Sequence, residues 1–141
     1  MNNKNINKIK FSIITVTKNS EKYLERNILS LKKQIYNNYE HIIIDSNSKD
    51  KTKKILRKYK SDLKVLSEDD EGLYYAMNKG IKLASGQVIG ILNSDDFYYP
   101  KALKIINDYF TNNPKIDFVF GSTIKYNKIM TGFYPWKIHW T

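Results

Sequence analysis

Two adjacent carboxylates, Asp95 and Asp96, follow an apolar run at 86–92 that the sequence predicts to be a strand. An apolar run without alternation is typical of a strand that is covered on both faces, as in a parallel sheet. Ligands of open α/β sheets bind beyond the C-terminal ends of such strands. A divalent cation that carries substrate phosphates needs only one or two protein carboxylates. The pair therefore indicates either a phosphate-linked metal site or an acidic turn, and both interpretations stay open for the pair alone.

Polar residues also follow the ends of the other predicted strands. They are Thr17 and Asn19 after the strand at 11–17, Asp45 at the end of the strand at 41–45, Asp70 in the acidic loop after the strand at 63–66, and Asn93 just before the aspartate pair. Because the C-terminal ends of parallel strands lie at one edge of a sheet, we expect these side chains to converge. Taken singly, Asp45 is equally well explained by a strand-terminal turn, and Asp70 more readily by a helix cap. Only the group as a whole supports a binding site.

Four helices are predicted between and after these strands, each with an apolar face. The first starts at a cap formed by Asn19 or Ser20, and the second follows the polar loop at 46–50. The third follows Gly72, and the fourth begins at Pro100, a residue favoured in the first helical turn. The residues expected to face inward are Leu24, Ile28, Leu31 and Ile35; Ile55, Leu56 and Tyr59; Leu73, Ala76, Met77, Gly80, Ile81 and Ala84; and Leu103, Ile106 and Phe110.

A fifth strand is predicted at 116–121, where apolar and aromatic residues lead to Gly121. Strands that alternate with helices over short connections are typical of an α/β domain with a mostly parallel sheet and helices on both faces. The 141 residues suffice for one such domain. We expect a single domain over 1–141, with a flexible polar tail at 1–10.

The composition limits the class and the location of the protein. The chain has no cysteine, no apolar run near the ~20 residues of a membrane span, and no signal peptide, so a cytoplasmic protein is expected. Lys and Arg outnumber Asp and Glu by 24 to 14, a formal net charge of +10. Such a charge favours nucleic acid, anionic lipid headgroups or a phosphorylated substrate as a partner. Because the lysines are dispersed except at 51–60, we interpret them mainly as solvated surface, with attraction to a membrane second.

Several enzyme classes are disfavoured because their motifs are missing. The sequence contains no G-x-G-x-x-G after the first strand and no G-x-x-x-x-G-K-[ST], the phosphate-binding loops of dinucleotide and P-loop enzymes. It contains neither a G-x-S-x-G nucleophile elbow nor an H-E-x-x-H zinc helix. His41, at the head of an apolar strand, is more readily structural than catalytic.

Four segments together resemble the family-two glycosyltransferases. They are Ser12–Asn19 (SIITVTKN), Ile42–Asp50 (IIIDSNSKD), Ser67–Gly80 (SEDDEGLYYAMNKG) and Ala84–Pro100, and they occur in the order and spacing of the family. The resemblance covers nearly everything from Phe11 to Gly121. It implies an inverting enzyme of the GT-A fold, a Rossmann-like α/β fold, that uses a nucleotide-sugar donor.

The resemblance also implies roles for the candidate residues. Asp95 would lie toward the ribose, and Asp96 would bind a divalent cation, Mg²⁺ or Mn²⁺, that bridges the diphosphate at a DXD-type motif. The other donor-binding candidates are Thr17 and Asn19 beside the nucleotide, Asp45 at the nucleobase or ribose, Asp70 at the base pocket, Asn78 and Lys79 on a donor-side helix, and Asn93 before the aspartates. An acceptor hydroxyl would attack the anomeric carbon from the opposite face.

The sequence departs from the family pattern in two places. Val16 stands where a proline is common before the first-strand threonine. The general base of the family, an acidic residue that deprotonates the acceptor, is expected well beyond the fifth strand, but no Asp or Glu follows Gly121. We therefore identify no catalytic residue and expect the base beyond Thr141. The chain would then lack the acceptor half of the fold, either as a fragment of a longer enzyme or as a truncated donor-binding protein with little transferase activity.

The function predicted is transfer of a sugar, with inversion, to a glycan or lipid-linked acceptor in cell-envelope polysaccharide synthesis. The protein would act in the cytoplasm, with peripheral association at the inner face of the membrane as a secondary expectation. One alternative is a basic nucleic-acid-binding module, which would need clustered basic residues with exposed stacking aromatics. Another is a phosphotransfer enzyme that uses Asp45 or Asp95 as its nucleophile.

Overall fold

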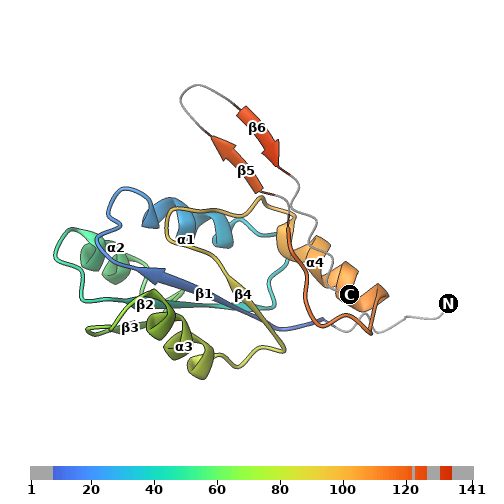
Figure 1. Ribbon diagram of the computed structural model, residues 1–141, viewed down its shortest axis with the longest axis horizontal. Coiled ribbons are helices and arrows are strands. Elements are labelled where there is room, and N and C mark those ends of the chain that lie inside the picture. The colour runs from blue at the N-terminus through green and yellow to red at the C-terminus, as the bar shows by residue number, and fades with distance from the viewer. Residues whose placement is uncertain (1–7, 122, 127–130, 135–141) are drawn as a thin grey trace.

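The structure is a computed structural model that describes residues 8–121, 123–126 and 131–134 (Figure 1). Its main feature is a four-stranded sheet of order β3-β2-β1-β4, in which every strand runs parallel to its neighbours. The strands are β1 (Phe11–Thr17), β2 (Tyr39–Asp45), β3 (Lys64–Ser67) and β4 (Val88–Ile91). The predicted parallel sheet is confirmed, and the C-terminal ends of its four strands lie at one edge.

Helices cover both faces of this sheet, as predicted (Figure 1). The helices are α1 (Leu24–Lys32), α2 (Thr52–Lys58), α3 (Leu73–Leu83) and α4 (Ala102–Asn112). Successive side chains of β1 point to opposite faces. Phe11 and Ile13 pack with residues of α1 and α4, whereas Ile14 and Val16 pack against α3. Helix α2 lies on the same face as α1, where Leu56 joins a third buried cluster.

Small residues let α3 approach the sheet closely. A Cβ atom added at Gly80 would lie 2.4 Å from Cγ2 of Ile14, so this spacing requires glycine. Ala76, one turn earlier, is also buried. The contact between α3 and the sheet is narrower than predicted. Leu73 and Ile81, both expected to face inward, are 52% and 43% exposed. A helix held this close to a sheet touches it along one line of residues four apart, and residues beside that line face solvent.

Helix α1 is shorter than the predicted apolar stripe. The backbone carbonyl of Ser20, rather than a capping side chain, accepts the N–H groups of Tyr23 and Leu24 at 3.0 Å each. The helix ends at Lys32, so Ile35 leaves the stripe, and its side chain is 63% exposed. The N–H of Ile35 donates to Pro100 O at 3.0 Å, which joins the segment after α1 to the segment before α4.

Strand β4 is an edge strand in the part of the chain that the structure describes, and the predicted burial of both its faces is wrong. Its register places Ile89 and Ile91 beside Ser12 and Ile14, on the face that α3 covers. Helix α3 packs mainly over β1 and β2, however. Both isoleucines of β4 are consequently 41% exposed.

The predicted fifth strand at 116–121 is also wrong. Residues 117–121 have no regular structure, and Phe118 and Phe120 are 57% and 61% exposed. Their apolar pattern suits a strand, but a strand also needs a neighbour with which to exchange hydrogen bonds. The next strands are β5 (Thr123–Tyr126) and β6 (Thr131–Tyr134), an antiparallel pair that projects away from the sheet (Figure 1). Among the described residues, no helix has the length and apolar character to cross a bilayer.

The N-terminal tail expected at 1–10 is described from Lys8 onward. There, Asn38 Nδ2 donates to Lys8 O at 2.9 Å, and the N–H of Ile9 donates to Asn107 Oδ1 at 3.2 Å. These bonds attach residues 8 and 9 to the segment before β2 and to α4.

Glu40 joins three strands near the N-terminal edge of the sheet, opposite the edge where the candidate residues lie. Its Oε2 pairs with Lys64 Nζ at 2.6 Å, and its Oε1 accepts the Ser12 hydroxyl at 2.5 Å and the Ser85 N–H at 2.7 Å. The Glu40 side chain is only 11% exposed. Burial alone would raise the pKa of Glu40, but these bonds outweigh burial and lower the pKa to about 2.

Acid is therefore expected to destabilise the fold through Glu40. A carboxylate with a lower pKa in the folded state adds stability above its unfolded pKa, and this stability is lost as the pH falls through the folded pKa. The drop from 4.5 to about 2 corresponds to roughly 3 kcal/mol. We expect Glu40→Gln to lower the melting temperature at neutral pH and to flatten the decline of the melting temperature on acidification from about pH 5 to about pH 2.

The control is Asp62→Asn, which removes an exposed pair with Lys32 and should keep the wild-type decline of the melting temperature. The same decline in both variants would contradict this assignment.

Candidate functional site

The loops that follow the four parallel strands are bonded to one another at the C-terminal edge of the sheet. We call this edge the rim, and it comprises residues 17–20, 45–50, 67–70 and 93–96. The bonds between loops join Ser20 Oγ to Ser94 Oγ (2.9 Å), Asn19 N–H to Ser48 Oγ (2.8 Å), and Ser46 Oγ to Asp70 Oδ2 (2.7 Å). Side chains that are far apart in the sequence are thus brought to one edge.

Two asparagines shape the loops of the rim. Asn19 and Asn47 have φ values of 52° and 50°, in the left-handed region that asparagine tolerates better than most residues. Asn19 Oδ1 accepts the N–H of Lys49 at 2.8 Å, while its own N–H donates to Ser48. Asn19 therefore joins the loop after β1 to the loop after β2 through two hydrogen bonds.

Asp45 is fully buried, and both of its carboxylate oxygens are bonded within the protein. The Ser48 N–H lies 3.3 Å from each oxygen, the Ser48 hydroxyl donates to Oδ1, and the Ser67 hydroxyl donates to Oδ2 at 2.6 Å. Its exposed fraction is 0%, so a ligand would not reach the carboxylate without displacing these partners. The same burial leaves no accessible nucleophile at Asp45 for phosphotransfer. In this arrangement Asp45 holds the loop that follows it.

Asp70 forms an internal ion pair with Lys79 of α3. The Asp70 side chain is 1% exposed, and Lys79 Nζ also pairs with Glu68 at 2.6 Å. Burial alone would raise the pKa of Asp70, but the bonds from Lys79 and Ser46 outweigh burial and lower the pKa. Asp70 does not cap α3, whose N-cap is Gly72. It attaches the acidic loop to the helix, and the neighbouring Asn78 is exposed on that helix.

The hydroxyl of Thr17 is a buried polar atom of the rim that lacks a hydrogen-bond partner among the described residues. The residue is 3% exposed, and within the described part of the chain its Oγ1 has no hydrogen-bond partner and less than 1 Å² of accessible surface. A buried hydroxyl without a partner costs about 1–3 kcal/mol. Such a group in a native fold calls for an explanation, and a bound ligand is one.

Asn93, Asp95 and Asp96 are exposed at the end of β4. The N–H of Asp96 donates to Asn93 O at 3.0 Å, which closes a turn. Asn93 Nδ2 lies 3.4 Å from Asp96 Oδ2 across the same turn. The turn therefore presents two carboxylates to solvent beside the buried polar groups of the rim.

The carboxylates present fit a metal ion that brings ligands with it, rather than a metal centre made by protein alone. The described residues contain no group of three or more His, Cys, Asp or Glu that would hold a metal. Mg²⁺ and Mn²⁺ are hard cations, and Mg²⁺ commonly takes one or two carboxylates together with water and substrate phosphates. Asp95 and Asp96 match that requirement.

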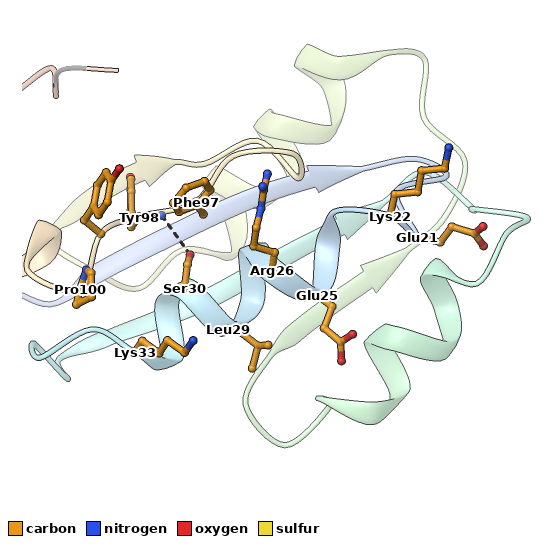
Figure 2. Close-up of a pocket in the computed structure, with 11 residues that line it drawn as sticks. Glu21, Lys22, Glu25, Arg26, Leu29, Ser30, Lys33, Phe97, Tyr98 and Pro100 are labelled. Carbon is orange, nitrogen blue, oxygen red and sulfur yellow. Dashed lines mark hydrogen bonds between the residues drawn. The ribbon is translucent and has the colours of Figure 1, made fainter. Parts of the chain in front are cut away.

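An open pocket of ≈ 560 Å³ lies beside the rim, between α1 and the segment 97–100 (Figure 2). Arg26 lies over the ring of Phe97, 4.7 Å from its centroid, and donates to Asp95 O at 2.6 Å. The sequence did not point to Arg26 or to its neighbour Asn27. The available signal was a row of polar residues that are buried in the structure, namely Asn27 and Ser30 on α1 and Gln34 just after its end.

Comparison with known proteins gives the same fold. The crystal structure of S. aureus TarS 1–349 in complex with UDP-GlcNAc matches 75% of this chain and 32% of that chain, with a TM-score of 0.68 and 30% sequence identity. The mannosyltransferase PcManGT from Pyrobaculum calidifontis, in complex with GDP-Man and Mn²⁺, matches 74% of this chain and 32% of its own, with a TM-score of 0.65. At 20% identity its likeness concerns the fold alone.

Two named relatives are similar in sequence. WfgD of Escherichia coli, a UDP-Glc:alpha-D-GlcNAc-diphosphoundecaprenol beta-1,3-glucosyltransferase, is 35% identical over 114 residues, which are 79% of this chain and 44% of WfgD. The poly(ribitol-phosphate) beta-N-acetylglucosaminyltransferase TarS of Staphylococcus aureus is 33% identical over 102 residues, which are 68% of this chain and 18% of TarS. This chain thus spans less than half the length of either relative.

The family model described as Glycosyl transferase family 2 matches residues 12–140, nearly the whole chain. The parallel sheet, its helices and the TarS structures identify the fold as GT-A, of which this chain forms the N-terminal part. The chain therefore belongs to glycosyl transferase family 2.

Proposed function

We propose that this chain binds the nucleoside-diphosphate sugar of an inverting, metal-dependent glycosyltransferase, and that the donor lies across the rim. The observation that carries the proposal is the exposed pair Asp95 and Asp96 at an edge where four loops are bonded together. TarS 1–349, 30% identical to this chain, was crystallised with UDP-GlcNAc, and the name of WfgD specifies UDP-Glc. Both relatives support a uridine nucleotide as the carrier.

The two exposed aspartates would hold the diphosphate end of the donor. We assign Asp96 to a divalent cation, Mg²⁺ or Mn²⁺, and Asp95 to the ribose or to the same cation. When bound, that cation would stabilise the negative charge of the departing nucleoside diphosphate as a Lewis acid. The turn closed by the Asp96 N–H and Asn93 O sets the backbone from which both carboxylates extend.

The other candidate residues fall into two groups, those that would contact the donor and those that support the loops of the rim. We assign Thr17, Asn93 and Asn78 as contacts, because the first has an unpartnered hydroxyl and the other two are exposed. The supports are Asn19, Asp45, Asp70 and Lys79, whose polar atoms are bonded to other residues of the rim or of its loops. For Asp45 and Asp70 this changes the role from direct contact to positioning.

The acceptor would be a glycan or a lipid-linked glycan of the cell envelope. WfgD is named for a diphosphoundecaprenol-linked acceptor and TarS for poly(ribitol-phosphate), and both names support this class. Transfer with inversion requires the acceptor hydroxyl to attack opposite the diphosphate, with a general base beside it. We assign that base to no residue of this chain, because no Asp or Glu follows Gly121.

The other candidate function is a basic nucleic-acid-binding module, and membership of the family favours donor binding over it. Donor binding is therefore the property to test first.

The chain is expected to bind UDP in the presence of Mn²⁺ and at least about tenfold more weakly after chelation, since the two aspartates alone repel a diphosphate. Isothermal titration calorimetry of UDP and GDP, each with Mn²⁺ and with EDTA, measures this. Absence of binding by both nucleotides with metal present would contradict the proposal.

Asp96→Asn is expected to abolish most of the gain in UDP affinity that Mn²⁺ provides, a loss of at least about tenfold, because the neutral amide is a weaker metal ligand. The melting temperature should stay near that of the wild type, since the side chain is exposed. Asp117→Asn, at an exposed position outside the rim, is the control and should bind UDP like the wild type. An unchanged metal dependence in Asp96→Asn would refute the assignment.

Thr17→Val is expected to make the free chain more stable and to weaken its binding of UDP. Without the unpartnered hydroxyl, the free energy of unfolding of the free chain should rise by about 1 kcal/mol. UDP affinity should fall by about threefold to tenfold, because the hydroxyl would gain its partner from the bound donor after a small shift of the loop at 17–20. Chemical denaturation and calorimetry measure the two effects. A more stable variant with undiminished affinity would show that Thr17 does not meet the donor.

A further inference from the structure

Helix α1 and Gln34, two residues after its end, hold the segment after β4 through a row of side chains that bond to the backbone of that segment. Arg26 donates to Asp95 O at 2.6 Å, Ser30 Oγ accepts the Tyr98 N–H at 3.2 Å, and Gln34 Nε2 donates to Tyr99 O at 2.7 Å. Figure 2 shows the contact between Ser30 and Tyr98 along the side of the helix. The position of the turn at 93–96 is therefore set by α1 as well as by the sheet.

Asn27 differs from the other members of this row because it bonds both ends of that turn. Its Nδ2 donates to Asn93 O at 2.8 Å and to Asp96 O at 3.1 Å. Asn27 is 0% exposed, so water would not readily replace the amide. The two carbonyls flank Asp95 and enclose the same turn that the Asp96 N–H closes.

The orientation of the Asn27 amide is fixed by its neighbours. Backbone carbonyls only accept hydrogen bonds, so the amide nitrogen must face the turn and Oδ1 must face the interior. There the Thr15 hydroxyl lies 3.4 Å from Oδ1 and 3.0 Å from Nε2 of His41. When Thr15 donates its single hydrogen to Asn27, it accepts one from His41, which burial keeps neutral by lowering its pKa to about 3.

We propose that Asn27 is a positioning residue for the donor site, which fixes the turn that carries Asp95 and Asp96 and so sets the affinity for the metal–diphosphate group. This inference rests on the proposed function for its consequence in binding, but its structural part concerns the free chain. Asn27 touches no reacting atom in this role. It acts through two backbone carbonyls, and Thr15 and His41 keep its amide oriented.

The test compares Asn27→Leu with Asn107→Leu in the 141-residue chain. Asn107 on α4 is a matched control, because it is 1% exposed and its Oδ1 is bonded within the fold to Ile9 N–H and the Tyr36 hydroxyl, at the opposite edge of the sheet. Both variants remove a buried amide and are expected to lower the melting temperature. Only Asn27→Leu should accelerate hydrogen exchange at the Asp96 and Tyr98 amides, by at least about tenfold relative to the control.

The same pair of variants separates positioning from general destabilisation in binding. Asn27→Leu should lose at least about tenfold in the gain of UDP affinity that Mn²⁺ provides, while Asn107→Leu should keep it. Thr15→Val removes the donor to Asn27 Oδ1 and also the partner of His41 Nε2, but it keeps both bonds from Asn27 to the turn. It provides a milder variant if Asn27→Leu does not fold, and it should shift both readouts in the same direction by a smaller factor.

Hydrogen exchange at 93–98 that is equal in Asn27→Leu and the control overturns the inference, and so does a retained Mn²⁺ dependence of UDP binding. If the wild type binds no nucleotide with metal present, the proposed function fails, and the exchange rates alone then decide whether Asn27 positions the turn.

Discussion

The structure of the rim depends on the burial of one carboxylate, Asp45, at the end of β2. A carboxylate removed from water is strongly unfavourable unless its oxygens are hydrogen-bonded, so Asp45 restricts its surroundings to conformations that supply donors. Ser48 and Ser67 supply them from two different loops. Ser48 in turn accepts the N–H of Asn19, and this bond places the loop after β1. A single buried side chain thus fixes three of the four loops of the rim relative to one another.

The fourth loop, which carries Asp95 and Asp96, is held by different means. Strand β4 lies at the edge of the sheet and is only four residues long, so the ladder with β1 ends before the turn at 93–96. Polar side chains of α1 provide the bonds that the sheet does not. As a result the same helix buries Leu24, Ile28 and Leu31 against the sheet and offers Arg26 and Asn27 to the turn. The turn that carries the two exposed aspartates is therefore held mainly through its backbone carbonyls.

Much of this arrangement could be predicted from the sequence, and the predictions that were wrong have identifiable physical reasons. The parallel sheet, the helices on both faces and the gathering of Asp45, Asp70, Asp95 and Asp96 at one edge follow from apolar runs that end in polar residues. Two predictions were wrong, namely that Ile89 is buried and that residues 116–121 form a strand. Each would need a neighbouring element that a local sequence pattern does not specify. The division of the acidic residues into buried supports and exposed contacts depends on side-chain partners such as Lys79 and Ser67, which come from distant positions. The role of Asn27 could not be predicted from the sequence, because a polar residue beside an apolar stripe is ordinarily expected at the boundary with solvent.

The order of the elements along the chain places every part of the proposed donor site in one interval of the sequence. All four loops of the rim follow the first four strands, and every bond that joins them lies between residues 17 and 96. The two helices that hold them, α1 and α3, fall in the same interval. Under the proposed function, the acceptor and a general base would meet the donor at this edge, and neither is needed to hold the turn that carries Asp95 and Asp96. Because the proposed donor site is assembled from one continuous stretch, its metal and nucleotide contacts would not depend on the segments that select the acceptor.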